Sequence, residues 1–197
     1  AFTSLDATSN TNLESIFINA STLSSINVNN LTSLRILNLQ GTNISSIDLS
    51  TNTALDYIGL INTPIASLDL SNNPLLTTVA LSGTTNITSI DLHHHPNLLN
   101  VFIHDSNLEY VDMRNGNNTN VSSFSANNTP NLSCVNVDNA AYAVANWTVN
   151  GGTSAFAEHC NETYVPDNNF EAYLEANGMG NGIANYELRI IMYQVLM

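Results

Sequence analysis

SSIDLSTNTALDYIGLINTPI, residues 45–65, contains two copies of one short pattern. In the first copy Ile47 and Leu49 flank Asp48, and in the second Ile58 and Leu60 flank Gly59. This alternation has the period of a β-strand, in which both apolar side chains point inward and the residue between them points outward. The stretch therefore predicts two short strands joined by turns.

The same pattern returns along most of the chain. Six units align with a period of 21 residues, one unit having 22, and they cover residues 3–23, 24–44, 45–65, 66–87, 88–108 and a degenerate unit from Glu109. A single unit has no means of burying its leucines, whereas stacked units form a continuous core. Stacking at about 4.8 Å per coil gives a rod roughly 29 Å long. The sequence predicts a mainly β solenoid with short parallel strands on two faces.

This pattern resembles the leucine-rich repeat family, in particular the bacterial class with nested units L-x-x-L-x-L-x-x-N-x-L-x-x-L-D-L-x-x-N. The resemblance covers residues 3 to about 133. It implies a right-handed solenoid with little helix, export to the cell surface, and binding through a sheet face. The asparagine of the first half is replaced here by Ser21, Thr42, Thr63, Thr84 and Ser106. An asparagine ladder is expected after the Asp-containing half instead, at Asn10, Asn52 and Asn73, with His95 in that place later.

Three regions are expected along the chain: the solenoid at 1–133, a C-terminal cap at 134–162 and a helix-containing segment at 163–197. The last segment includes YVPDNNFEAYLEANGMGNG, which predicts a turn and then an amphipathic helix. It resembles the cap that opens such arrays. Because residues 1–23 begin directly with a repeat, we expect residues 163–197 to fold back on their own domain or to cover the open coil of a second molecule, giving a homodimer.

The two cysteines, Cys134 and Cys160, have no metal-ligand spacing around them. Paired, they close a loop of 27 residues, which in the chain-entropy model stabilises the fold by roughly 3–4 kcal/mol. The alternative is two buried free thiols. Pairing is the preferred interpretation, and a disulfide in a terminal cap favours a secreted or cell-surface protein.

The charge balance excludes several function classes. The chain has sixteen acidic residues, three arginines and no lysine, for a net charge of −13. This argues against binding to nucleic acid or to anionic lipid surfaces. No run of 18 apolar residues exists, so no membrane insertion is expected. No P-loop, G-x-S-x-G or H-E-x-x-H motif is present, so we expect neither enzymatic activity nor a cofactor.

One outward face of the predicted solenoid repeats an acidic residue in nearly every coil, at Asp6, Asn27, Asp48, Asp69, Asp91 and Asp112. The preferred interpretation is structural: neighbouring Ser and Asn residues hydrogen-bond the carboxylates, and the charge protects a flat sheet from aggregation. The alternative is a calcium-dependent solenoid with a cation stripe at Asp48, Asp69, Asp91 and Asp112. The run His93–His95 is expected to form a solvated turn rather than a metal site.

The other outward face changes from coil to coil and exposes bulky apolar groups. Its candidate ligand-binding residues are Phe17, Ile36, Asn38, Tyr57, Ile61, Asn100, Phe102 and His104. Varied side chains and an exposed apolar patch are typical of a recognition surface. The expected function is recognition of a protein partner, or adhesion, by a secreted or cell-surface module. The alternative is a carbohydrate-binding module that uses the aromatic side chains as stacking platforms.

Overall fold

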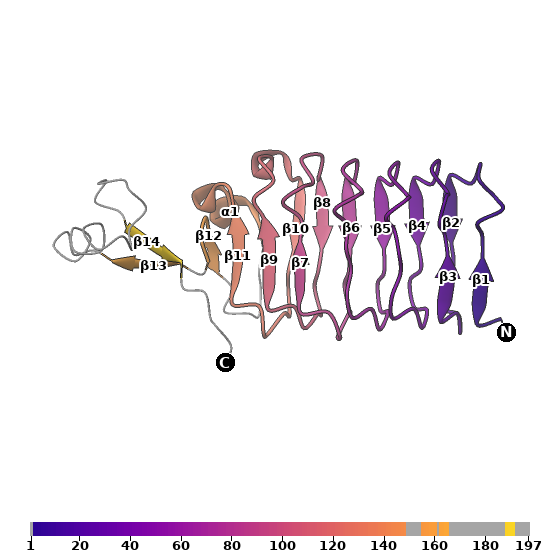
Figure 1. Ribbon diagram of the computed structural model, residues 1–197. Helices are drawn as coiled ribbons and strands as arrows, with labels where there is room; N and C mark the ends of the chain where they lie inside the picture. The colour runs from indigo at the N-terminus through magenta and orange to yellow at the C-terminus, as the bar shows by residue number, and fades with distance from the viewer. Residues whose placement is uncertain (1, 149–154, 161, 166–187, 192–197) are drawn as a thin grey trace. The chain divides into compact units, whose positions relative to one another are not determined.

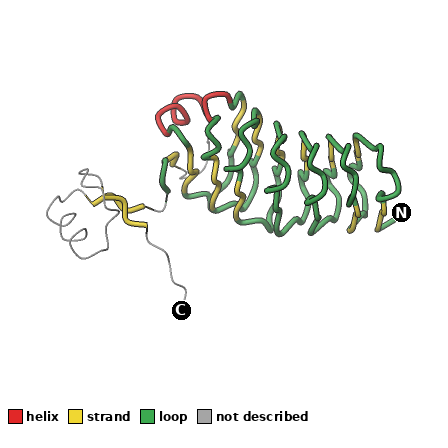
Figure 2. Tube along the Cα trace, turned by 45° about the horizontal axis from the view of Figure 1, so that its top comes forward, coloured by secondary structure: helices red, strands yellow, loops and turns green. Residues whose placement is uncertain are grey.

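The computed structural model describes residues 2–148, 155–160, 162–165 and 188–191. The chain divides into two compact units, Ala1–Glu158 and His159–Met197. In the first unit, short parallel strands stack along one axis, and turns connect the two sides of each coil (Figures 1 and 2). The predicted mainly β repeat solenoid with little helix is confirmed.

One side of the coils forms a six-stranded parallel sheet in the order β10-β8-β6-β5-β4-β2. Its strands are β2 Ser15–Phe17, β4 Ile36–Asn38, β5 Tyr57–Gly59, β6 Thr78–Ala80, β8 Asn100–Phe102 and β10 Ser123–Ser125. The register pairs equivalent residues of successive coils. The middle side chain of each strand therefore enters the core, and the residues on either side of it face outward.

The opposite side carries the Asp-containing segments and is less regular. β1 (Ser4–Asp6) pairs with β3 (Ser25–Asn27). A second, four-stranded sheet has the order β12-β11-β9-β7 and consists of β7 Ser89–Asp91, β9 Tyr110–Met113, β11 Cys134–Val137 and β12 Ala155–Ala157. Residues 46–48 and 67–69, between the two sheets, are not strands, yet Ile47 and Leu68 still pack against the core.

A cap follows the last coils. The short 3-10 helix η1 (Asn118–Asn120) lies in the turn before β10, and α1 (Ala140–Asn146) begins after Asn139, whose side chain accepts a hydrogen bond from the backbone N–H of Tyr142. Trp147 stacks on Phe124 with ring centroids 4.7 Å apart, and Phe156 meets both rings edge-on. These aromatic rings extend the core toward its C-terminal end. Cys134 and Cys160 form a disulfide, as preferred from the sequence.

The second unit contains an antiparallel pair, β13 (Glu162–Val165) and β14 (Leu188–Ile191). The amphipathic helix predicted within YVPDNNFEAYLEANGMGNG, with Asp167 or Asn168 as its N-cap, lies outside the described residues.

Two kinds of polar group line the turns of the solenoid. A buried hydroxyl group follows each strand of the six-stranded sheet from β4 to β10. It donates a hydrogen bond, 2.6–2.8 Å long, to the backbone carbonyl three residues earlier. The donors are Thr42, Thr63, Thr84, Ser106 and Thr129. On the other side, Asn52 and Asn73 donate across to the preceding coil, Asn73 reaching the carbonyls of Leu49 (3.1 Å) and Asn52 (2.9 Å). The hydroxyls therefore fix single turns, whereas the asparagines join one coil to the next.

His95 takes the place of an asparagine in this ladder. Its Nε2 lies 3.0 Å from the carbonyl oxygen of Leu70, so the neutral ring donates there, while the buried Nδ1 has no partner among the described residues. Burial lowers the pKa of His95 below its ordinary value, more than the Leu70 and Leu92 contacts and the charge of Asp91 raise it. A proton on Nδ1 would have no acceptor.

This arrangement predicts a pH dependence of stability. Because the pKa of His95 is lower in the folded state, the unfolded chain binds more protons, and the free energy of unfolding falls as pH drops below about 6.5, by at most about 1.4 kcal/mol per pH unit. Urea unfolding at pH 7.5, 6.5 and 5.5 measures this decline. In His95→Asn, which restores the ladder residue, the decline over this range should disappear; an unchanged decline would assign it to another group.

A left-handed backbone position recurs where the chain leaves the six-stranded sheet. The residues with positive φ there are Ala20, Gly41, Asn62, Gly83, Asp105 and Asn128. Most of these are residue types that tolerate this conformation, whereas Ala20 (φ 46°) has a Cβ that strains it. At Gly83 (φ 72°) an added Cβ would lie 2.0 Å from Oδ1 of Asn62.

Opposite substitutions at these two equivalent positions should therefore have opposite effects. We expect Ala20→Gly to raise the free energy of unfolding by about 0.5–1 kcal/mol, and Gly83→Ala to lower it by about 1–2 kcal/mol. Urea unfolding of both variants beside the parent chain provides the measurement. Effects of the same sign would show that the turn conformation does not determine the response.

Candidate functional site

The acidic positions of the first outward face, which we call the Asp column, share one repeated contact. In each coil the side-chain oxygen at this position accepts the backbone N–H two residues later, at 2.9–3.2 Å, and the accepting residues are Asp6, Asn27, Asp48, Asp69, Asp91 and Asp112. Asn27 makes the same bond without a charge. The position thus needs a short side chain with an oxygen acceptor, and the hydrogen bond to this oxygen stabilises the turn that follows.

The same contact lowers the pKa of three exposed carboxyl groups. The backbone N–H groups of Thr8, Ser50 and Ser71 hold the pKa values of Asp6, Asp48 and Asp69, respectively, below their ordinary value. Within the described ranges, no group of three or more His, Cys, Asp or Glu side chains is placed to hold a metal ion. The described contacts of this column are those of a structural element.

Asp112 differs from the rest of its column because Arg114 covers it. The guanidinium binds the carboxylate through Nε (3.0 Å) and Nη2 (2.6 Å), and Asp112 is 7% exposed. Burial raises its pKa, but the hydrogen bonds and charge of Arg114 outweigh this and leave the pKa below the ordinary value. His93 contacts Asp91 at 2.6 Å, whereas His104 lies on the other side of the solenoid and contacts Asp105 at 2.8 Å.

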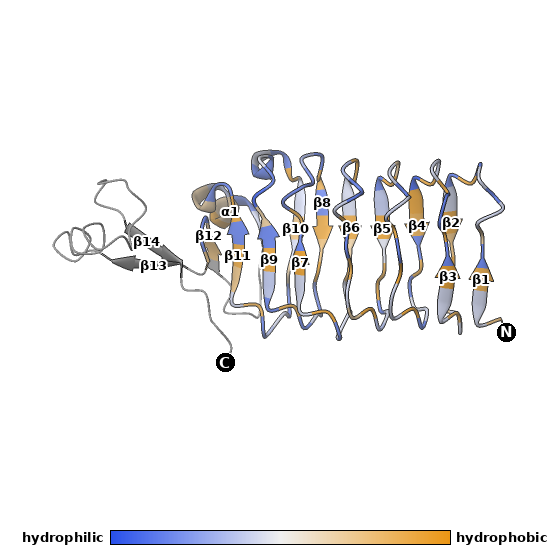
Figure 3. Cartoon of the chain, viewed as in Figure 1, coloured by the Kyte–Doolittle hydropathy of each residue, from blue (hydrophilic) through white to orange (hydrophobic). Residues whose placement is uncertain are grey.

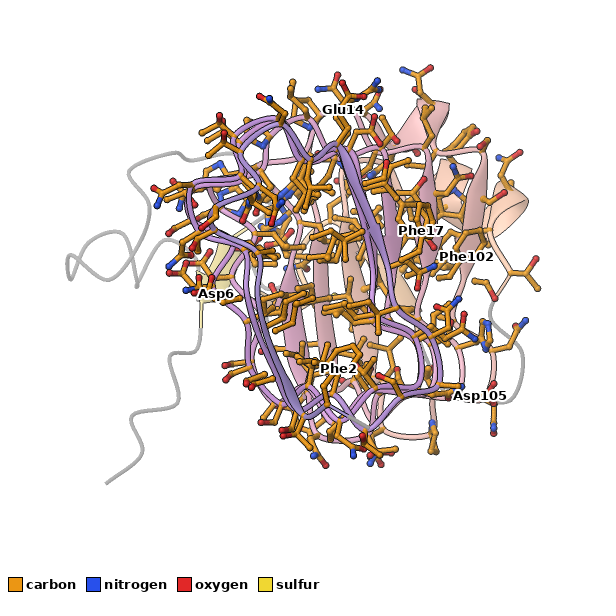
Figure 4. The ribbon with its side chains drawn as sticks, turned by 90° about the vertical axis from the view of Figure 1, so that its right-hand side faces the viewer. Phe2, Asp6, Glu14, Phe17, Phe102 and Asp105 are labelled. Atoms are coloured by element: carbon orange, nitrogen blue, oxygen red, sulfur yellow. The ribbon has the colours of Figure 1, made fainter. Side chains whose placement is uncertain are left out.

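The outward rows of the six-stranded sheet hold no residue with a formal charge. Three outward rows cross its six coils: 15-36-57-78-100-123, 17-38-59-80-102-125 and 19-40-61-82-104-127. None of these positions holds Asp, Glu, Lys or Arg, although the chain has sixteen acidic residues. Figure 4 shows Phe17 and Phe102 on this side and Asp6 on the opposite side. Phe17 and Phe102 therefore lie on a different face from Asp6.

Four of the eight candidate residues lie around one depression on this face. Phe17, Ile36, Asn38 and Tyr57 line it together with Asp56, Thr77 and Thr78, and its volume is about 410 Å³. Phe17 is 61% exposed. The ring of Tyr57 lies over Gly59, where an added Cβ would come within 3.0 Å of the ring Cε1 and the hydroxyl. Gly59 thus lets the tyrosine lie flat against the sheet.

The other four candidates lie apart from this depression. Asn100 and Phe102 are on β8, where Asn100 donates to Oγ1 of Thr78 at 3.2 Å. Ile61 and His104 occupy the third outward row and are half-buried. In Figure 3 the hydrophobic colour covers much of β4, whereas β5 and β6 are paler, and these colours include the core-facing residue of each strand.

Sequence reasoning missed a second hollow, which we call the rim groove. It lies at the edge where the chain enters the six-stranded sheet and has a volume of about 780 Å³. Its lining residues are Arg35, Ala54, Asp56, Leu75, Thr77, Pro96, Asn97, Leu99, Asn117 and Asn120. Asp56 and Thr77 also line the depression on the sheet, so the two hollows share these two residues.

Fold and faces together define a leucine-rich-repeat-like β-solenoid with one acidic face and one face whose outward rows are uncharged. No protein-family model matches the chain, and no curated protein is similar to it in sequence. Among solved structures, it is similar to the functional domain of InlJ from Listeria monocytogenes, described as including a cysteine ladder, at 24% identity and a TM-score of 0.57. The match covers 70% of this chain and 29% of that one, and at this identity it supports the fold alone.

No helix within the described part of the chain has the length and apolar character needed to cross a membrane.

Proposed function

We propose that this chain is a non-enzymatic binding module that recognises a protein partner through the outward face of the six-stranded sheet. The observation that carries the proposal is the absence of formal charge from the three outward rows of that face in a chain of net charge −13. The centres of protein interfaces are depleted of charged residues and enriched in aromatic ones. Phe17 and Tyr57 beside a shallow depression, with Phe102 further along the same sheet, fit that description.

We further propose that the module works outside the cell, as a secreted or surface-attached adhesin. The disulfide between Cys134 and Cys160 supports an oxidising compartment. The acidic face, whose carboxylates are engaged by backbone N–H groups, keeps the opposite side of the solenoid soluble.

Carbohydrate binding is the second candidate, because Phe17 presents an exposed ring beside the Asn38 side chain. An array of surface proteins and an array of glycans, probed with the same labelled chain, separate the two functions. Binding to glycans alone would replace the proposed protein partner.

The proposed face is tested with the triple variant Phe17→Ala/Tyr57→Ala/Phe102→Ala. We expect its Kd for the partner found on the arrays to rise at least about 30-fold, since removing aromatic residues from the centre of an interface costs about 2 kcal/mol or more. Its melting temperature should stay within a few degrees of the parent chain. The matched control, Asp48→Asn/Asp69→Asn/Asp91→Asn, keeps the turn contacts and should bind normally; the reverse result would place the site on the Asp side.

A further inference from the structure

The rim groove contains apolar residues that the solenoid does not need. Leu75 is 51% exposed and Leu99 is 42% exposed, so neither contributes much to the core. Repeat-equivalent positions provide an internal comparison. The equivalents of Leu75 in other coils are Asn12, Ser33, Ala54, Asn97 and Asn120, and those of Leu99 are Glu14, Arg35, Asp56, Thr77 and Ser122. Two adjacent coils thus each carry a leucine at one rim position where the other coils have small, polar or charged residues. Both leucines line the same hollow.

The groove is electrically neutral as a whole. Its charged residues, Arg35 and Asp56, pair with each other, Nη2 to Oδ2, at 2.5 Å. In a chain of net charge −13, this paired groove therefore has no net charge of its own with which to select a charged ligand. The guanidinium is also largely exposed, its side chain being 63% accessible, and retains N–H groups for a ligand carbonyl.

Three asparagines, Asn97, Asn117 and Asn120, line the groove together with the leucines. Asn97 donates through Nδ2 to the carbonyl of Pro74 at 3.1 Å, and Asn120 donates through Nδ2 to Oδ1 of Asn117. The Oδ1 atoms of Asn97 and Asn120 accept no hydrogen bond within the described residues. A peptide group offers the N–H donor and the carbonyl acceptor that such carboxamides complement. No aromatic side chain lines the groove, so it offers no stacking surface to a sugar ring.

We propose that the rim groove is a docking site for an extended, uncharged peptide segment with aliphatic side chains. Leu75, Leu99 and Pro96 would contact the side chains, and the carboxamides would bind the backbone. The groove runs from Arg35, beside β4, to Asn120, beside β10, across four strand spacings of about 4.8 Å, or roughly 19 Å. An extended peptide of about six residues has that length.

This inference extends the proposed function, because the groove and the sheet depression share Asp56 and Thr77 as lining residues. One protruding segment of a partner would then lie in the groove while the body of the partner contacts the sheet. The peptide site nevertheless has its own residues, so its failure is distinguishable from failure of the sheet face.

The probe is a library of N-acetylated, C-amidated peptides of four, six and eight residues, alternating Leu, Ile or Val with Ser or Gln and labelled with a fluorophore. We expect affinity, measured by fluorescence polarisation on the full chain, to rise from four to six residues and to level off at eight. For the tightest hexapeptide, Leu75→Asn/Leu99→Thr should raise Kd at least about tenfold, which corresponds to about 1.4 kcal/mol. Both replacements are residues found at equivalent positions in neighbouring coils, Asn97 and Thr77.

Two controls keep the outcome decisive. Ser33→Asn places an asparagine at the position equivalent to Leu75 but outside the groove lining, and it should leave the Kd for the hexapeptide within about twofold of the parent value. All variants should have melting temperatures close to that of the parent chain, because the changed residues are exposed. Phe17→Ala/Phe102→Ala should also leave hexapeptide affinity unchanged. The proposal is overturned if no library peptide binds, if binding ignores Leu75 and Leu99, or if glycans bind in a manner that depends on them. Loss of peptide binding only in the Phe17/Phe102 variant would place the peptide on the sheet face.

Discussion

Replacing Asn73 with alanine should destabilise the solenoid by about 2–4 kcal/mol. Asn73 is fully buried and donates two hydrogen bonds to the preceding coil, to the carbonyls of Leu49 and Asn52. Each bond contributes about 1 kcal/mol net, and the deleted carboxamide leaves a small cavity between tightly packed coils. Urea unfolding, followed by far-ultraviolet circular dichroism, measures the loss.

The neighbouring Asn72→Ala provides the matched control. Asn72 is exposed, and its Nδ2 donates to Oγ of Ser71 at 3.3 Å. Its replacement should change the free energy of unfolding by less than about 0.5 kcal/mol. Equal effects at the two positions would contradict a special role for the ladder.

Thr63→Ala tests the contribution of a buried turn hydroxyl for comparison with that of a ladder asparagine. The hydroxyl of Thr63 donates to the carbonyl of Leu60 in its own turn, at 2.7 Å, and we expect its removal to lower the free energy of unfolding by about 1 kcal/mol. The stability of a solenoid is the sum of its repeats and the interfaces between them, so the group that joins coils matters more than the group that closes one turn.

The repeat architecture followed from the sequence because its cause is local and repeated. Pairs such as Ile58 and Leu60 specify an inward face, and their recurrence every 21 residues specifies stacking. The strands on the Asp side were less predictable. Ile47 and Leu68 are half-buried, as the apolar pattern predicts, but their segments form no β-strand. Backbone pairing depends on the geometry of neighbouring coils, which apolar alternation does not specify.

The outward face was predictable as a set of positions but not as a site. Alternation identifies Phe17, Tyr57 and Phe102 as outward residues. It does not reveal that the Tyr57 ring lies over Gly59, because that depends on side-chain direction. The signal for the rim groove was present in the sequence, as leucine at positions 75 and 99 where other coils carry small, polar or charged residues, and a column-by-column comparison of the repeats would have found it.

Reducing the disulfide between Cys134 and Cys160 should destabilise the cap by about 3.5 kcal/mol. The closed loop holds 27 residues, from 134 to 160, and the chain-entropy model gives this value for its length. The loop contains α1, β12 and Trp147, whose ring packs against Phe124 and Phe156. Reduction increases the freedom of the unfolded loop and so favours release of these elements from the end of the core.

Trp147 is the single tryptophan of the chain, so its fluorescence reports on the cap alone. With dithiothreitol, we expect the tryptophan transition to fall by roughly 10 °C. The matched control is Cys134→Ser/Cys160→Ser, which should melt like the reduced parent and should not respond to dithiothreitol. The far-ultraviolet signal, dominated by the coils, should fall less than the tryptophan signal, because solenoid repeats depend mainly on their nearest neighbours. A shift below about 1 °C on reduction would mean that packing of the Trp147 ring, rather than the covalent link, holds the cap in place.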